Sequence, residues 1–217
     1  DYRFLAWAAD DGIPDWWESH IVSNAAHTSI PETVDLTAPG MSHVVYFTSE
    51  PRVSHRMWMH SDLSEVESKV LSLWFDSSFG LLQMLLTRVP GRGGWTKYRK
   101  YTQNRFYTIH PNRLSDEEKS EMMDFFGDFH DAEAPSLVKQ MARNVNPKNL
   151  TDEQRKALER HFPEAEDELC DGFEPKKTLD ETILSVLGFE EDRTKEILEI
   201  IYVDLLIELV ELKEMME

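Results

Sequence analysis

The pattern of apolar and polar positions in residues 41–59 predicts two β-strands. Residues 41–49 are rich in β-branched and aromatic side chains, and residues 53–59 alternate between apolar and polar positions. Both features are typical of strands. Residues 49–52 (SEPR) have the composition of a turn. We therefore expect two strands joined by a turn at residues 49–52.

Helical spacing of apolar residues follows over residues 63–86, and Ser61-Asp62 is placed to cap this helix. Two cap-type serines precede a glycine within residues 77–80, so we expect the helix to bend or break there. The glycine-rich residues 90–94 suit neither a helix nor a regular strand. Residues 95–109 are predicted to be extended.

The second half of the chain is predicted to be helical. Three segments match the capping box, in which side chains satisfy the free amides of a first helical turn: residues 115–118, 151–154 and 178–181. Gly188 is well placed to end the third of these helices. A last helix is expected over residues 190–215, and its apolar face comprises Ile197, Ile201, Leu205 and Leu209.

The distribution of charge also changes after residue 114, where the helical second half begins. Residues 1–114 contain 11 basic and 12 acidic side chains, whereas residues 115–217 contain 12 basic and 29 acidic ones. We expect an α+β chain of two parts. Residues 1–114 form a mixed part with a few strands and a long helix, and residues 115–217 form an acidic, all-helical part.

Composition limits the cellular environments in which we expect the protein. No run of about 18 uncharged apolar residues is present, so no membrane partner is expected. Cys170 is the only cysteine, which excludes an internal disulfide and a cysteine-based zinc site and fits a reducing cytoplasm. The chain begins without an initiator Met or a signal-peptide pattern, and we expect it to be a piece of a longer polypeptide.

Motifs that would indicate catalysis are missing from the sequence. No glycine-rich turn joins a strand to a helix, and no Walker loop, Gly-x-Ser-x-Gly elbow or His-Glu-x-x-His motif occurs. Asp62, Glu67 and Lys69 resemble the carboxylate–lysine group of metal-dependent nucleases, but their helical pattern favours a solvated helix face. We therefore predict no catalytic residue and no metal site.

A basic, aromatic stretch is the strongest indication of function. No acidic residue lies between Asp76 and Asp116, and the interval holds seven cations: Arg88, Arg92, Lys97, Arg99, Lys100, Arg105 and Arg113. Five aromatic residues alternate with them: Trp95, Tyr98, Tyr101, Phe106 and Tyr107. Cations neutralise phosphates and aromatic rings stack on bases, so this composition favours a nucleic-acid surface. A hairpin with a basic face, or one paired with the acidic helices, remains the alternative.

Residues 70–88 (VLSLWFDSSFGLLQMLLTR), followed by residues 91–97 (GRGGWTK), resemble the C-terminal part of adenine-N6 DNA methyltransferases of restriction-modification and phage-defence systems. Residues 114–118 and 179–188 fit the same order of elements, although Asp76 stands where that family usually has Asn. The resemblance implies that methyl transfer from S-adenosylmethionine belongs to a catalytic domain N-terminal to this chain. This chain would then bind no cofactor and contact double-stranded DNA and that catalytic domain.

By this resemblance, five residues are expected to approach the DNA backbone: Arg88, Gly91, Gly93, Gly94 and Lys97. Charge and shape add Arg92, Trp95, Tyr98, Lys100 and Arg105. The predicted function is that of a non-catalytic DNA target-recognition and DNA-positioning region. The alternative is a protein-interaction module without DNA contact, whose acidic C-terminal helix docks a basic partner or self-associates through its apolar face.

Overall fold

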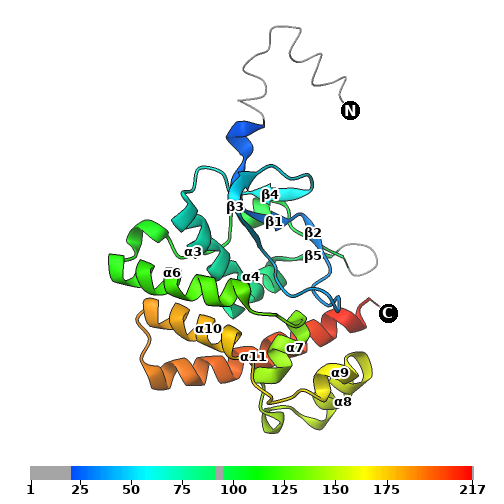
Figure 1. Ribbon diagram of the computed structural model, residues 1–217. Helices are drawn as coiled ribbons and strands as arrows, with labels where there is room; N and C mark the ends of the chain where they lie inside the picture. The colour runs from blue at the N-terminus through cyan, green and yellow to red at the C-terminus, as the bar shows by residue number, and fades with distance from the viewer. Residues whose placement is uncertain (1–20, 91–94, 217) are drawn as a thin grey trace.

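The computed structural model describes residues 21–90 and 95–216, and its fold is α+β (Figure 1). The strands lie at one end of the molecule and most of the helices of the second half at the other, with α3, α4 and α6 between them. Gly91, Arg92, Gly93 and Gly94 lie outside the described residues.

Two small antiparallel sheets make up the strand end. The first has the order β3-β1-β4, with β1 at Ala26–Pro31, β3 at Tyr46–Arg52 and β4 at Met57–Met59. The second has the order β2-β6-β5. Its strands are β2 (Thr33–Val34), β5 (Val89–Pro90) and β6 (Thr96–Lys97).

The predicted hairpin is wrong. β3 continues through residues 49–52, which were expected to turn, and β1 lies between β3 and β4. β1 is buried along nearly its whole length, so its sequence shows no alternation that would predict a strand. The buried Thr28 hydroxyl is satisfied by the Ser68 carbonyl at 2.9 Å and by the Ser72 hydroxyl at 3.1 Å. These bonds tie the central strand to the next helix.

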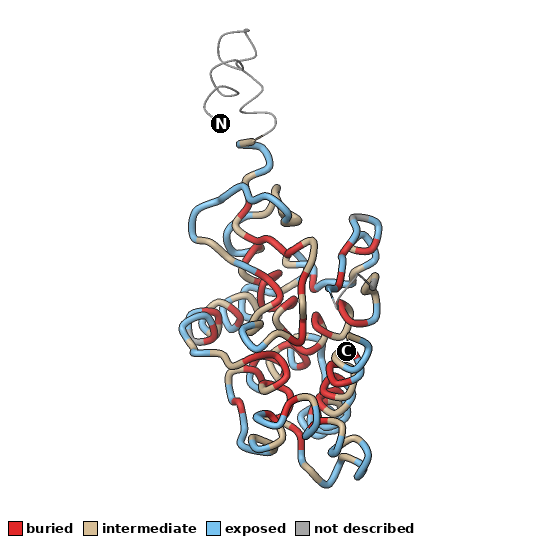
Figure 2. The backbone as a smooth tube through the Cα atoms, turned by 90° about the vertical axis from the view of Figure 1, so that its right-hand side faces the viewer, coloured by how far each residue is buried: buried red, intermediate tan, exposed pale blue. Residues whose placement is uncertain are grey.

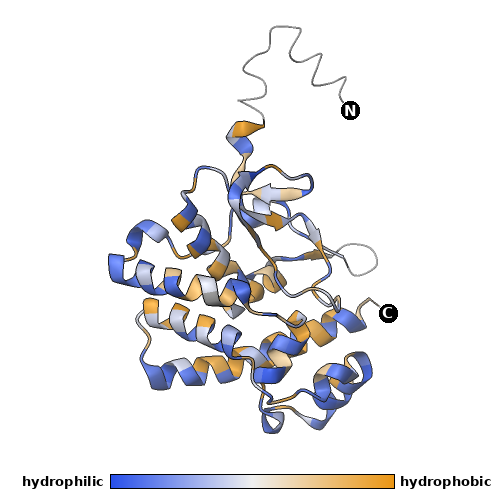
Figure 3. Ribbon diagram, viewed as in Figure 1, coloured by the Kyte–Doolittle hydropathy of each residue, from blue (hydrophilic) through white to orange (hydrophobic). Residues whose placement is uncertain are grey.

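The helices of the described chain run in this order: α3 (Glu65–Asp76), α4 (Ser78–Thr87), α5 (Lys100–Gln103), α6 (Asp116–Asp131), α7 (Leu137–Asn144), α8 (Asp152–His161), α9 (Pro163–Glu166), α10 (Glu174–Val186) and α11 (Glu191–Glu214). Short 3-10 turns lie at Val22–Asn24, Pro111–Arg113 and Pro147–Asn149. Figure 3 shows hydrophobic and hydrophilic residues interleaved along α10 and α11. Their buried residues recur at helical spacing, as Leu179 and Ile183 do in α10 and Leu198, Ile201 and Leu205 do in α11.

Several helix ends agree with the sequence pattern. The capping boxes at Ser115 and Thr151 are confirmed, and Gly188, with φ at +83°, follows the end of α10. Two predictions are wrong. α3 is capped by Ser64 rather than by Ser61-Asp62, and α10 begins at Glu174, ahead of the third capping box. Pro175 in the first turn starts this helix, because proline lacks only an amide hydrogen that has no partner there.

The predicted extended segment after residue 94 is only partly present. β6 covers two residues, and the short helix α5 follows at Lys100–Gln103. The predicted break in the long helix is confirmed: Ser77 is both the C-cap of α3 and the N-cap of α4. The two helix axes differ by 69° across this residue.

Two charged side chains of α10 meet the broken helix ends. The ammonium of Lys176 donates to the main-chain carbonyl of Asp76, the last residue of α3. The carboxylate of Asp180 accepts from the amide of Ser78 at 2.7 Å and from its hydroxyl at 2.6 Å. Tyr202 of α11 adds a third hydrogen bond to Asp180, at 3.0 Å. The break is therefore held by the helical half of the chain.

One hydrophobic cluster crosses the predicted boundary at residue 114, from Ile30 of β1 to Leu212 of α11, and the buried residues that form it run through the interior of the fold in Figure 2. Ile201, Leu205 and Leu209 are buried in this cluster, and Ile197 packs against it. The apolar face proposed for self-association is thus already occupied by the chain's own core. No single described helix is long and apolar enough to cross a membrane; α3 and α4 pass that test only as a bent pair.

Replacing Gly80 with Ala is expected to lower the free energy of unfolding by about 1–3 kcal/mol. A Cβ at this position would lie 2.4 Å from the Trp74 carbonyl oxygen and 2.5 Å from that of Phe75, and both atoms belong to the backbone. Urea denaturation measures the loss. Gly127→Ala in α6 is the control, since a Cβ there meets nothing within 4 Å and should stabilise the helix by about 1 kcal/mol. Equal midpoints for the two variants would contradict the close packing at the break.

Candidate nucleic-acid interface

Strand alternation in residues 95–99 separates a core face from a solvent face. Thr96 and Tyr98 are buried, whereas Trp95, Lys97 and Arg99 are exposed. The register is fixed by pairing of Lys97 with Thr33 and by the Tyr98 amide, which donates to the Glu32 carbonyl at 2.9 Å. Side chains of a strand point alternately to opposite faces, so these three exposed residues project together.

This alternation shows that one predicted DNA-contacting residue, Tyr98, points into the core. Tyr98 is 0% exposed, and burial raises the pKa of its phenol. Its ring packs beside Phe106, with centroids 6.5 Å apart, and its main-chain carbonyl accepts a hydrogen bond from the Trp58 indole at 2.7 Å. Tyr98 is therefore a core residue that anchors the segment, and its side chain does not reach the surface.

Arg88 is directed toward the helical half of the chain. Its guanidinium donates to the Leu85 carbonyl at 2.5 Å and forms an ion pair with Glu208 of α11 at 3.2 Å. The side chain is only 18% exposed. The expectation that Arg88 approaches a DNA backbone does not fit this placement, because its charge is already used within the protein. The Gly-rich residues beside it lie outside the described chain.

The remaining predicted residues lie on or near the exposed segment. Arg105 is exposed just after α5, and Lys100 begins that short helix. Lys97, Arg99 and Arg105 form no ion pair with any other described residue. Their charges are therefore free to meet an anion from solution, in contrast to the charge of Arg88.

A tyrosine outside the predicted set is the most unusual residue of the segment that follows α5. Tyr107 is 83% exposed, yet its backbone is held from two helices. Its carbonyl accepts from the Trp74 indole and from the Gln83 amide, each at 2.8 Å, and its amide donates to the Gln83 side chain at 2.6 Å. The ring thus projects into solvent from a fixed backbone. Position in an aromatic-rich segment was the only indication of it in the sequence.

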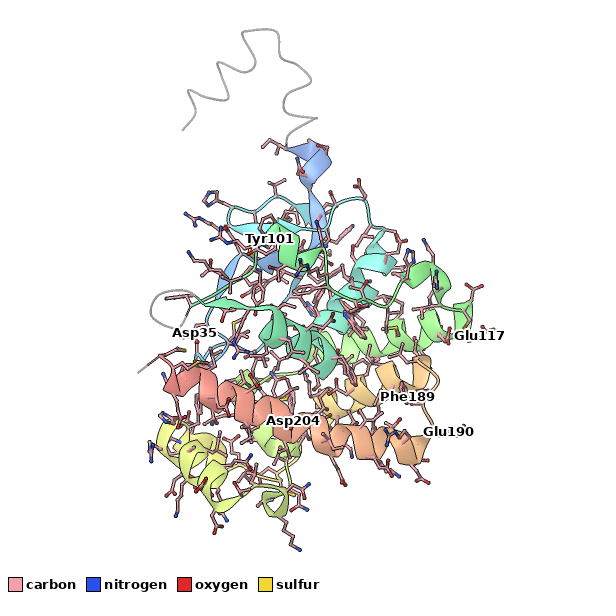
Figure 4. The ribbon with its side chains drawn as sticks, turned by 180° about the vertical axis from the view of Figure 1, so that it is seen from behind. Asp35, Tyr101, Glu117, Phe189, Glu190 and Asp204 are labelled. Carbon is pink, nitrogen blue, oxygen red and sulfur yellow. The ribbon has the colours of Figure 1, made fainter. Side chains whose placement is uncertain are left out.

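Exposed cations and aromatic rings gather at the strand end of the molecule. Figure 4 shows Tyr101, which is 60% exposed, at this end, whereas Glu190 and Asp204 lie toward the opposite one. Trp95 adds a second large ring to this surface, at 51% exposure. A surface that combines unpaired cations with exposed rings suits a polyanion that carries planar bases.

A cavity of about 470 Å³ opens between β4, α3 and the loop that follows α5. Its walls include Trp58, His60, Phe75, Gln103 and Phe106. Of the carboxylate–lysine group that resembles metal-dependent nucleases, Glu67 lines this cavity, but the sequence favoured a solvated helix face for the group. Glu67 serves the capping box of α3, and Lys69 pairs with Glu65 at 2.7 Å. Within residues 21–90 and 95–216, no group of three or more His, Cys, Asp or Glu side chains is arranged to hold a metal ion.

A second cavity, of about 260 Å³, lies between β3, α3 and α6. Its polar wall is a pair formed by His43 Nδ1 and the Asp76 carboxylate, 3.0 Å apart. The hydrogen bond to Asp76 raises the pKa of His43, although burial and the charge of Lys176 oppose this. The other carboxylate oxygen of Asp76 accepts from the Val44 amide at 3.0 Å. This pair therefore fastens the start of β3 to the end of α3.

Comparisons of the chain with known protein families, with curated proteins and with solved structures returned no significant match.

The His43–Asp76 pair predicts a pH-dependent stability. A raised pKa in the folded state stabilises the fold below the ordinary value of 6.5, and this contribution is lost as pH rises through the raised pKa. The unfolding free energies of the wild type and of His43→Gln should therefore differ most at low pH and converge at high pH. Urea titrations between pH 5 and 9 measure the gap. His55→Gln, at an exposed position, is the control, and a gap that widens with pH would contradict the assignment.

Proposed function

We propose that this chain is a non-catalytic DNA-positioning region of an S-adenosylmethionine-dependent adenine-N6 DNA methyltransferase. The observation that carries the nucleic-acid part is a segment, residues 97–107, that exposes the unpaired cations Lys97, Arg99 and Arg105 and, on a backbone held from two helices, the ring of Tyr107. The assignment to methyltransferases rests on the sequence resemblance of residues 70–97. Cofactor binding and methyl transfer would take place on a catalytic domain of the same polypeptide.

Charge and ring geometry support duplex DNA as the ligand. Lysine and arginine side chains release counterions from phosphates when they bind, which gives affinity without sequence preference. The backbone of Tyr107 is held from two helices, so binding has to order only its side chain, which lowers the entropic cost of the contact. The strand-end surface thus supplies both the affinity and a fixed contact that sets the orientation of the duplex.

The interaction-module alternative receives less support. The apolar face of α11 proposed for self-association is buried in the core. Among the basic side chains that the structure describes in residues 88–113, Arg88 is the one that pairs with an acidic helix. Pairing with the acidic helices therefore accounts for Arg88. It does not account for the exposed charges of Lys97, Arg99 and Arg105.

Duplex binding is expected to weaken with salt and to depend on the exposed cations. The double variant Lys97→Ala/Arg99→Ala should lower the slope of log K against log salt by about 1.8, since each phosphate contact contributes about 0.9. Fluorescence anisotropy of a labelled duplex across a salt series measures both affinity and slope. Lys148→Ala, which removes an exposed cation between α7 and α8, is the matched control and should leave the slope unchanged. The same slope for wild type and double variant would contradict the proposal.

Tyr107 is expected to contribute through its ring. Tyr107→Ala should weaken DNA binding by up to about 1.5–3 kcal/mol, the value for burying a large apolar side chain, because the ring would pack on the sugars of the duplex, while Tyr107→Phe retains most of the affinity. Thermal unfolding should hardly change in either variant, because the side chain is 83% exposed. Anisotropy measured beside unfolding curves separates binding from folding. A Tyr107→Ala variant that binds DNA as the wild type does would remove this residue from the interface.

A further inference from the structure

The larger cavity has the size and position of a ligand site. It occupies about 470 Å³ between β4, the middle of α3 and residues 103–111, beside the exposed surface described above. Small-molecule sites in proteins commonly measure 300–1,000 Å³ and combine apolar walls with a few polar groups. This cavity has the required size, and its wall is mixed: eight of the fourteen lining residues are apolar. The polar ones include His60, Gln103, Asn104 and Glu67, and the Glu67 carboxylate serves the capping box of α3.

Its apolar wall suits a planar ligand. Trp58 of β4, Phe75 of α3 and Phe106 of the following loop all line it. Phe75 and Phe106 are neighbours, with ring centroids 5.7 Å apart and planes inclined by 58°. Aromatic rings bind other flat π-systems by stacking or by edge contacts, which disfavours a branched aliphatic ligand relative to a heteroaromatic one.

Its polar wall suits a ligand with hydrogen-bonding edges. Gln103 and His60 both line the cavity, and Gln103 Nε2 and His60 Nε2 are buried without a hydrogen-bond partner among the described residues. A buried polar group without a partner costs free energy, which a ligand that pairs with it restores. Asn104 offers a second amide. Amide groups carry a donor and an acceptor side by side, as the edges of nucleobases do.

A cation lies next to the lining residues along the chain. Arg105 is exposed and stands between Asn104 and Phe106, both of which line the cavity. Guanidinium groups bind phosphate through paired hydrogen bonds, so Arg105 is the candidate partner for an anionic group that extends out of the cavity.

We propose that this cavity binds one nucleotide, with its base between Trp58, Phe75 and Phe106 and its phosphate toward Arg105. The base edge pairs with the amides of Gln103 and Asn104. The nucleotide has two possible sources: a free nucleoside monophosphate, or a nucleotide turned out of a DNA strand. The second source rests on the proposed function, whereas the first is independent of it.

The first experiment uses the four deoxynucleoside monophosphates, with deoxyribose 5-phosphate as the baseless control. Saturation-transfer NMR should show transfer to the base protons of at least one nucleotide and none to the control compound. Gln103→Leu, which keeps the size of the side chain and removes the amide, should weaken binding about tenfold or more, and Asn104→Trp should block it. Asn149→Leu, at an exposed position between α7 and α8, is the matched control and should bind as the wild type does.

A second experiment distinguishes the sources. Anisotropy compares a fully paired duplex with the same duplex carrying one unpaired nucleotide. A preference of about tenfold for the unpaired nucleotide, lost in Gln103→Leu, assigns the ligand to DNA. Equal affinities together with monophosphate binding assign it to a free nucleotide.

The proposal is overturned if no monophosphate shows transfer and both duplexes bind equally, or if Gln103→Leu and Asn104→Trp bind every probe as the wild type does. The paired duplex reports separately on the proposed function, because its salt-dependent binding depends on Lys97 and Arg99 and not on the cavity. Loss of that binding with intact monophosphate binding would overturn the proposed function alone.

Discussion

Two charged side chains on one face of α10 hold the break between α3 and α4. Lys176 and Asp180 are four residues apart, so they lie one helical turn from each other. The ammonium binds a carbonyl at the C-terminal end of α3, and the carboxylate binds the amide at the N-terminal end of α4. Each charge therefore meets the helix end of opposite partial charge and satisfies a backbone group that the break leaves without a partner.

Because Lys176 and Asp180 are buried, both charges need partners within the protein. Desolvation lowers the pKa of Lys176 and raises the pKa of Asp180, and the attraction between the two charges opposes both shifts. Buried charges are tolerated when they are paired and hydrogen-bonded, and Asp180 has three donors from Ser78 and Tyr202. Gly80 completes the bend, since the carbonyls of Trp74 and Phe75 occupy the space that a side chain would need. The mixed part and the helical part are thus joined by a buried polar cluster in addition to their shared hydrophobic core.

The bend also shapes the candidate interface. Trp74 lies on α3 and Gln83 on α4, and because the helices turn by 69° both side chains reach the backbone of Tyr107. A straight helix would place these two residues nine positions and about 13 Å apart along its axis, too far to share one carbonyl. The position of the Tyr107 ring therefore depends on the break between α3 and α4, which Lys176 and Asp180 of α10 hold in place.

The sequence predicts those helices and helix ends that are determined by residues close to them along the chain. Helical spacing, the capping residues at Ser115 and Thr151, the glycine after α10 and the serine–glycine break all act within a few residues. Strand order does not, because β1 acquires its central place from partners about 20 to 30 residues away along the chain. The same limit applies to the site. Tyr98 and Tyr107 look alike in sequence, and only tertiary contacts bury the first and expose the second.

Charge then restricts how a polyanion approaches the molecule. Residues 115–217 hold 29 acidic side chains against 12 basic ones, so the helical end repels phosphates over roughly a Debye length, about 8 Å at physiological salt. Arg88 lies where the two parts meet and is neutralised by Glu208, whereas Lys97, Arg99 and Arg105 keep their charges free at the strand end. Under the proposed function, attraction at one end and repulsion at the other would orient an approaching nucleic acid before any contact forms. The acidic helices would thereby help to define which face meets it.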